Sequence, residues 1–269
     1  MSQTAHESRP ETTVATGYRQ WPAHPALRDF VQCVWTNAVG DQAAPPHDRV
    51  LPDGCMDIVW DGISVFVAGP DTGPVSLADR PDTVYSGVRF RTGRAHQFLG
   101  VPAWELVDQR VPMLELGSPG SWGRLIADLQ SAPSAEAAAL ILENDLVAPL
   151  ATTGKPDPVV DALVAHLGGA PGIPADPLTT KVAEISRRIG VSERELLRRC
   201  RAAIGYGPKT LDRILRLQRA RSRSRTSSTL AELAVDAGYA DQSHLARECR
   251  RLAGLTPSDL FKPGATPPA

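Results

Sequence analysis

The chain has 269 residues, enough for two domains of ordinary size, and its 42% hydrophobic content is typical of folded cores, which excludes a mainly disordered protein. No apolar run approaches the ~20 residues that a membrane-spanning helix needs. Residues 1–17 are polar and lack the apolar segment of a secretory signal peptide, so we expect a cytoplasmic protein that does not contact a membrane.

The net charge of −1 hides an uneven distribution along the chain. From Lys155 onward there are 19 basic and 12 acidic residues, a net charge of about +7, whereas the preceding residues include 10 basic and 18 acidic, about −8. Because an acidic surface repels nucleic acid, we expect the N-terminal half to contact proteins or small molecules and the basic half to contact any DNA.

Short strands and then helices are predicted in the N-terminal half. Apolar runs punctuated by Gly, Pro and Asp predict strands at 57–60, 64–68 and 84–90. Helical periodicity predicts helices at about 93–99, 103–106, 121–129 and 135–146. We expect an α+β fold, with a mixed strand and helix domain over residues 18–150 that senses a signal or dimerises. A small β-barrel-like core is one form that this domain can take. Residues 1–17 are expected to be disordered.

Cys55 is a candidate for a ligand or redox site in the N-terminal half. It lies between Asp53 and Asp57, with His47 and Asp48 nearby, which is compatible with a ligand or redox site. The preferred interpretation is an ordinary Pro-Asp-Gly turn followed by a small buried cysteine. The four cysteines are widely spaced without a C-x-x-C pair, so neither a zinc cluster nor a cofactor is expected. We assign the aromatic residues to the core rather than to a ligand cage: Trp21, Trp35, Trp60 and Tyr85.

Residues 151–177 are interpreted as a linker. Two Pro/Gly-rich stretches, 152–158 and 168–177, flank an apolar segment at 159–167 that predicts a short helix. An all-α domain is expected over 178–262, followed by a disordered tail at 263–269.

The all-α region contains one pattern twice. Residues 182–191 align with 230–239 at an offset of 48, and the residues after the turn align at an offset of 49. The extra residue is best placed at Ala240, because a structural repeat tolerates an insertion in a turn. Each copy predicts a helix, a tight turn and a second helix, and residues 208–221 predict a further helix that joins the two copies.

The turn and cap residues support this interpretation. Gly190 suits the positive φ at a helix end, Ser192 suits the N-cap of the next helix, and Glu195 suits its capping-box partner. Asp241 is the matching cap in the second copy. The inward stripes are expected to be Leu196, Cys200 and Ile204 in the first copy and Leu245, Cys249 and Leu252 in the second.

Two helices joined by such a turn form a helix-turn-helix, whose second helix enters the major groove of DNA. The outward positions, and so the predicted DNA contacts, are Arg194, Leu197, Arg198, Arg201, Gln242, Ser243, Arg247 and Arg250. Arginine suits guanine and glutamine suits adenine, although phosphate contact is the commoner role of an exposed arginine. Arg198 and Arg247 occupy the same slot in both copies, so base contacts are assigned to them first. His244 suits either a phosphate or contact with the supporting helix.

Four arginines alternate with small residues near the end of the joining helix: Arg219, Arg221, Arg223 and Arg225. Either these arginines contact DNA phosphates, or they are solvated at a frayed end of the helix. The second interpretation is preferred because serine is a weak helix former.

These motifs resemble the DNA-binding domain of the AraC-type transcriptional regulators over about residues 179–260. The most specific segments are Ala-Gly-Tyr-Ala-Asp-Gln-Ser-His-Leu-Ala-Arg at 237–247 and Gly-Leu-Thr-Pro at 254–257. The resemblance implies a bacterial transcription factor that places two recognition helices in successive major-groove segments. Cys200 and Cys249 depart from the phenylalanine usual in the family, and this predicts weaker small cores. The segments 51–60, 87–90 and 99–102 resemble an N-terminal domain of a subset of these regulators, which implies no known effector.

The resemblance implies double-stranded DNA as a partner and no enzymatic activity. Further candidate partners are RNA polymerase, a small-molecule effector in the N-terminal domain and a second copy of the chain. Two other classes remain open, an enzyme fused to a DNA-binding domain and a protein-interaction module with a degenerate helix-turn-helix pair. A methyl-accepting repair enzyme would need clustered zinc-binding cysteines and an amidotransferase-like fusion a nucleophile elbow, and the sequence contains neither.

Overall fold

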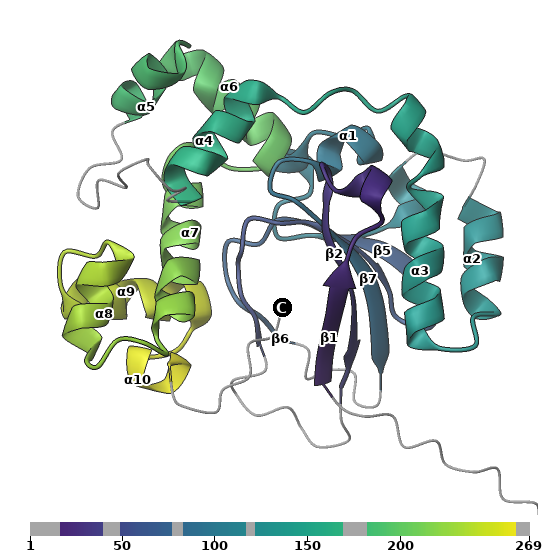
Figure 1. Cartoon of the computed structure of the whole chain (residues 1–269), viewed down its shortest axis with the longest axis horizontal. Coiled ribbons are helices and arrows are strands. Elements are labelled where there is room, and N and C mark those ends of the chain that lie inside the picture. The colour runs from purple at the N-terminus through teal and green to yellow at the C-terminus, as the bar shows by residue number, and fades with distance from the viewer. Residues whose placement is uncertain (1–16, 40–48, 77–82, 117–121, 169–181, 262–269) are drawn as a thin grey trace, which may run out of the picture.

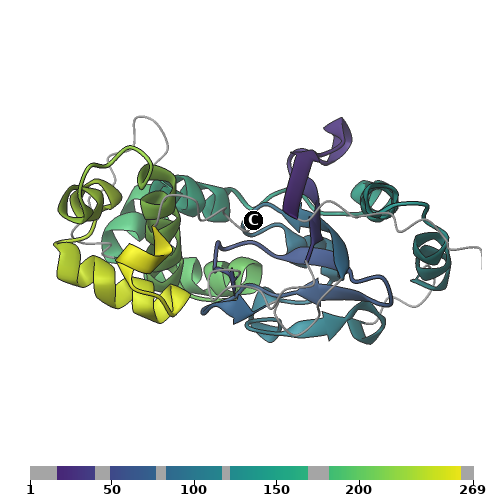
Figure 2. The same ribbon diagram turned by 90° about the horizontal axis from the view of Figure 1, so that it is seen from below.

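The computed structural model describes residues 17–39, 49–76, 83–116, 122–168 and 182–261. A β-sheet occupies the middle of the molecule, with helices α2 (Trp122–Gln130) and α3 (Ala135–Asp145) on one side and the helices of the C-terminal half on the other (Figures 1 and 2). The segments 1–16 and 262–269, which include almost all of the predicted disorder, lie outside the described residues. The first strand begins at Gly17.

The sheet is antiparallel and its strand order is not the chain order. Its six strands run β1-β2-β7-β4-β5-β8. They are β1 (Gly17–Pro22), β2 (Val31–Ala38), β4 (Asp57–Trp60), β5 (Val65–Ala68), β7 (Val84–Phe90) and β8 (Arg110–Pro112). A separate ribbon pairs β3 (Arg49–Val50) with β6 (Val75–Ser76). The predicted strands at 57–60, 64–68 and 84–90 are confirmed to within one residue, and the barrel-like core takes the form of an open sheet with a ribbon beside it.

The two faces of the sheet have different neighbours, because side chains alternate along each strand. Ile58, Val67 and Val88 belong to a large core that includes residues of α1 (Ala95–Leu99), α2 and α3. The opposite face carries Trp35 and Tyr85 in a smaller cluster. The helices predicted at 93–99, 121–129 and 135–146 are confirmed, whereas 103–106 forms the 3-10 helix η2 (Ala103–Glu105). The other 3-10 helices are η1 (Pro25–Leu27), η3 (Met113–Leu116) and η4 (Ala148–Ala151).

The C-terminal half is helical and has its own core. Its helices are α4 (Pro158–Gly168), α5 (Val182–Ile189), α6 (Glu193–Ile204), α7 (Pro208–Arg223), α8 (Leu230–Ala237), α9 (Gln242–Ala253) and α10 (Pro257–Leu260). The helix predicted at 159–167 is α4, and its buried residues Val160, Leu163 and Leu167 belong to the same core as α6 and α7. The segment interpreted as a linker therefore contributes a packed helix, because its apolar stripe needs a partner surface.

α7 is longer and better anchored than predicted. It runs to Arg223, and its buried stripe includes Leu211, Ile214 and Leu217. Arg219 donates to the carbonyl oxygen of Leu167 on α4, and Arg223 donates to that of Asp236 on α8. The preferred interpretation of a frayed end is therefore wrong for these two arginines, because backbone carbonyls of neighbouring helices accept their hydrogen bonds.

Candidate DNA interface and N-terminal cavity

The sequence repeat is a structural repeat. α5 and α8 have 8 residues each and are related by an offset of 48, and α6 and α9 have 12 residues each and are related by an offset of 49. The two helix-turn-helix units lie at opposite ends of α7 (Figure 1). Both the inserted turn residue and the helix bounds agree with the predicted alignment.

The turns use the predicted glycines and caps. Gly190 and its counterpart Gly238 have φ angles of +79° and +89°, where only glycine is unstrained. The hydroxyl of Ser192 accepts from the backbone N–H of Glu195, with 3.1 Å between the atoms, and Asp241 caps α9 in the same way. The predicted capping box at Ser192 is incomplete, because the carboxylate of Glu195 binds arginines instead. A complete capping box joins Thr229 and Glu232 on α8.

The inward stripes are confirmed. The side chains of these six residues are at most 2% exposed: Leu196, Cys200, Ile204, Leu245, Cys249 and Leu252. The Cys200 thiol lies 3.0 Å from the carbonyl oxygen of Tyr206, to which it donates. Tyr206 and Tyr239 are buried in the same core, where they supply aromatic volume beside the two cysteines.

The structure places the predicted DNA contacts on two surfaces, one on α6 and one on α9. Seven of the side chains are exposed: Arg194, Arg198, Arg201, Gln242, Ser243, Arg247 and Arg250. Leu197, in contrast, is partly buried. It packs close to Gly207, since a Cβ on Gly207 would lie 3.1 Å from the Cδ1 atom of Leu197. His244 makes an edge-to-face contact with Tyr239, with ring centroids 5.2 Å apart, which supports the packing alternative for this histidine.

An ion-pair network covers the first half of α6. Glu195 accepts from Arg198 at 2.7 and 2.8 Å and from Arg199 at 2.6 Å. Arg199 also donates to Asp157 at 3.0 Å, before the start of α4. These hydrogen bonds, first from Arg198 and then from Arg199, lower the pKa of Glu195 to about 2. Arg198 is thus exposed but already paired.

The N-terminal half contacts both recognition helices at their C-terminal ends. A Cβ on Gly205, the C-cap of α6, would lie 2.8 Å from Pro70 and 3.1 Å from the carbonyl oxygen of Ala103. Arg49 donates to the carbonyl oxygen of Ala253, the last residue of α9, at 3.3 Å. These contacts leave the outward arginine and polar side chains in the first halves of both helices exposed: Arg194, Arg198, Gln242, Ser243 and Arg247.

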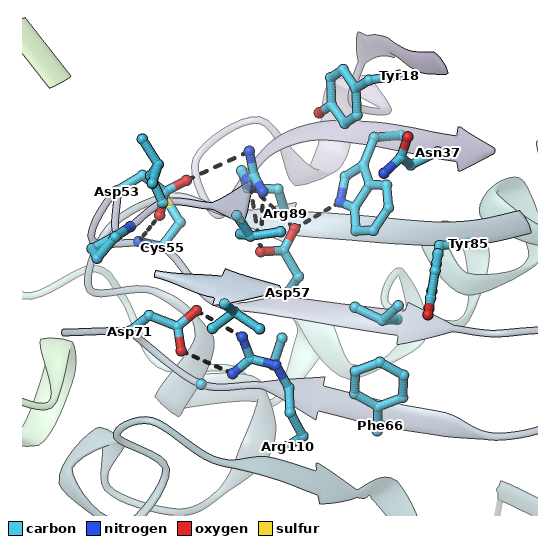
Figure 3. A pocket seen from close by; sticks show the side chains of 18 residues that line it. Tyr18, Asn37, Asp53, Cys55, Asp57, Phe66, Asp71, Tyr85, Arg89 and Arg110 are labelled. Atoms are coloured by element: carbon cyan, nitrogen blue, oxygen red, sulfur yellow. Dashed lines mark hydrogen bonds and ion pairs between the residues drawn. The ribbon is translucent and has the colours of Figure 1, made fainter. Parts of the chain in front are cut away.

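A cavity of about 90 Å³ lies on the sheet face that carries the smaller cluster (Figure 3). Tyr18, Trp35, Phe66 and Tyr85 contribute aromatic walls, and Val50 to Asp53 line it from the ribbon and the following loop. Gly87 makes room for Trp35, because a Cβ at this position would lie 2.4 Å from the indole ring.

Charged side chains line the same cavity. Arg89 donates to Asp57 at 3.1 Å and lies 3.5 Å from Asp53. Asp57 also accepts from the indole N–H of Trp35 at 2.7 Å. Arg110 donates to both oxygens of Asp71, at 2.7 and 2.9 Å. Burial raises the pKa of Asp57 and of Asp71, and the arginines oppose this shift.

These charged residues were not predicted as a group. Asp57 and Arg89 are opposite each other on β4 and β7, and Arg110 is opposite Ala68 on β5. One signal was available, since a charged residue inside a strand predicted to be buried needs a partner. The core assignment holds for Trp35, Trp60 and Tyr85, of which Trp35 and Tyr85 also line the cavity, whereas Trp21 is partly exposed.

Cys55 is buried and follows a turn, in agreement with the preferred interpretation of this segment. Its backbone N–H donates to Asp53 at 2.8 Å, and its thiol faces Gln32 and Thr92. Burial raises the pKa of this thiol well above its usual value, which disfavours the reactive thiolate. His47 and Asp48 lie outside the described residues. Within the described ranges, no cluster of His, Cys, Asp and Glu is arranged to hold a metal ion, and no helix has the length and apolar character to cross a membrane.

Comparisons with known proteins agree with the division into two halves. Residues 185–263 match a helix-turn-helix domain family, and residues 19–112 match a domain of unknown function, DUF6597. No curated protein sequence matches significantly.

Among solved structures, similar chains include three structures of ToxT from Vibrio cholerae. An apo variant is 11% identical and has a TM-score of 0.44, covering 91% of this chain and 96% of its own. Another crystal form is 10% identical with a TM-score of 0.45, covering 91% and 98%. An unsaturated fatty acid-bound form is 12% identical with a TM-score of 0.41, covering 85% and 93%. With its paired helix-turn-helix units and these domain matches, the chain carries a C-terminal helix-turn-helix domain of the AraC type behind an N-terminal domain of unknown function.

Proposed function

We propose that this protein is an AraC-type transcriptional regulator that recognises a specific DNA sequence by placing α6 and α9 in successive major-groove segments of one duplex. The observation that carries the proposal is that the first halves of both helices are exposed, with Arg198 and Arg247 in equivalent positions. The two surfaces also include Arg194, Arg201, Gln242, Ser243 and Arg250, together with the exposed part of Leu197. Arginine and glutamine at such positions distinguish guanine and adenine by paired hydrogen bonds.

The N-terminal domain, residues 18–150, is proposed to control the DNA-binding domain, residues 178–262, through direct contacts. Gln218 on α7 donates to the carbonyl oxygen of Pro52, in the loop that lines the cavity, with 2.6 Å between the atoms. A Cβ on Gly54 in the same loop would lie 3.2 Å from Leu211 on α7. Because α7 joins the two helix-turn-helix units, a displacement of this loop would be transmitted through α7 to both units. A small-molecule effector in the cavity is the proposed input, and a second copy of the chain and RNA polymerase are the proposed protein partners.

The DNA test uses the full-length protein. A duplex enriched from a random pool and a scrambled duplex of the same length are titrated at several salt concentrations. We expect the enriched site to bind about 10³-fold tighter or more, and both affinities to fall with salt. Equal affinities would contradict sequence-specific reading. The absence of salt-dependent binding to either duplex would favour the alternative of a protein-interaction module.

A further inference from the structure

The cavity in the N-terminal domain has the dimensions of a small organic ligand. Its volume of about 90 Å³ is several times the roughly 10–15 Å³ that a single water needs. Its lining includes residues from all six strands of the sheet, and Figure 3 shows the labelled side chains around this space. The cavity is built into the fold, because Gly87 provides the space into which the indole of Trp35 fits.

The charges in the lining do not balance. Three carboxylates, those of Asp53, Asp57 and Asp71, face two guanidinium groups, those of Arg89 and Arg110, which leaves the lining itself with a net charge of −1. Outside the lining, Arg221 on α7 interacts electrostatically with Asp53. Each guanidinium already has a carboxylate partner within hydrogen-bonding distance. An anionic ligand would therefore add a second negative charge or displace one of these carboxylates, and both are unfavourable in a buried site.

A positively charged ligand would stabilise the ionised carboxylates in this lining. Burial raises the pKa of Asp57 and Asp71, which means that the ionised carboxylates are poorly solvated. The aromatic rings of Tyr18 and Trp35 lie 6.0 Å apart at the cavity wall, and the faces of such rings attract cations. Asp53 is the carboxylate with the longest contact to an arginine, 3.5 Å, and its side chain is 25% exposed.

We propose that this cavity binds a small organic cation, a protonated amine or quaternary ammonium ion that carries a short apolar group. The cationic head would lie near Asp53 and Asp57, and the apolar group would contact Phe66 and Tyr85. The regulatory role of this ligand rests on the proposed function, since the cavity loop contacts α7 through Pro52. Binding itself requires no DNA.

Binding is tested on the full-length protein without DNA, by calorimetry and tryptophan fluorescence. The probes are butylammonium, tetramethylammonium, butyrate and butanol at matched ionic strength. We expect both cations to bind saturably and to shift the fluorescence through Trp35, and butylammonium to bind at least about tenfold tighter than butyrate or butanol, because only the cations gain the charge and ring contacts.

Two variants and one control complete the experiment. Asp53→Asn should weaken butylammonium binding about tenfold by removing a negative charge beside the cationic head, and its amide oxygen still accepts the N–H of Cys55. Phe66→Ala should weaken it through the apolar contact. Asp128→Asn, exposed on α2, should leave binding unchanged.

Three results would overturn the cation proposal. They are equal binding of butanol, tighter binding of butyrate, and no saturable binding of either cation at millimolar concentration. If the cations bind while the DNA titration shows no sequence preference, the proposed function fails and the cavity assignment stands. If the DNA titration shows a sequence preference while neither cation binds, the cavity assignment fails and the proposed function stands.

Discussion

Glu195 holds the guanidinium of Arg198 through two hydrogen bonds of 2.7 and 2.8 Å on the exposed surface of α6. The same carboxylate binds Arg199, so a single acidic residue restrains two arginines on the predicted DNA-binding surface. Because the pKa of Glu195 is lowered to about 2, mild acid does not break this network.

Replacing Glu195 by glutamine should therefore strengthen DNA binding. The change removes a negative charge near the phosphates and frees Arg198, while the Ser192 cap remains because it uses the backbone of residue 195. We expect an affinity gain of about three- to tenfold at low salt and a salt slope steeper by about 0.9, the value for one added phosphate contact. Glu193→Gln, the same charge change at an exposed position two residues earlier, is the control and should have a smaller effect. Weaker binding by Glu195→Gln would mean that the ion pair orients Arg198 for base contact.

Arg247→Ala tests the second recognition helix. If Arg247 contacts guanine with two hydrogen bonds, its loss should cost about 1–3 kcal/mol on the enriched site and relax the base preference at one position. Arg124→Ala, the same charge loss on the distant helix α2, should change neither affinity nor preference. The readout is a competition titration against all four base pairs at each position. A uniform loss on every sequence would instead assign Arg247 to a phosphate.

The contribution of α4 to the C-terminal core can be measured by a truncation of one side chain. Leu163 is completely buried among residues of the helical core, outside the segment that matches the helix-turn-helix family. Leu163→Ala should lower the free energy of unfolding by about 2–5 kcal/mol, with a parallel loss of DNA binding on heating. Leu140→Ala, the same substitution at a position that is 45% exposed, should stay within about 0.5 kcal/mol of the wild type. Equal effects of the two variants in chemical denaturation would show that α4 does not stabilise this core.

Gly87→Ala should disturb the cavity without changing any charge. The added Cβ would lie 2.4 Å from the indole of Trp35, so the ring must move, at a cost of about 1–3 kcal/mol. Tryptophan fluorescence and the melting temperature are the measurements. Gly123→Ala, in helix α2 with open space around the new methyl group, should be neutral or stabilising by up to about 1 kcal/mol. An unshifted emission spectrum together with wild-type stability would argue against this packing of Trp35.

The four cysteines should react slowly in the native protein. All are buried and free, and burial raises the pKa of every thiol, to about 12 for Cys200 and Cys249. A colorimetric thiol reagent at pH 8 should therefore detect little thiolate until guanidinium unfolds the chain, when all four thiols should react. Rapid native labelling of Cys55 would restore the reactive-site interpretation of this residue.

The helix-turn-helix units were predictable in detail because the signals that define them are local. Gly190 and Ser192 are two residues apart, and the inward stripe of each recognition helix repeats within 12 residues, so propensity and periodicity suffice. The incomplete capping box shows the limit of this reasoning, since the position of the Glu195 carboxylate depends on competing arginines one turn away.

The two helix-turn-helix units, their N-caps, their inward stripes and the helix that joins them could be predicted, because each follows from residues within a few turns of one another. The packing of α4 and the cavity depend instead on contacts between distant parts of the chain. Arg89 meets Asp57, and Arg110 meets Asp71, across separations of 32 and 39 residues. These pairs form because the strand order β1-β2-β7-β4-β5-β8 places β7 beside β4 and β8 beside β5. Long-range strand pairing of this kind leaves no periodic signal in a single sequence, and burial then forces the charged residues to find their partners.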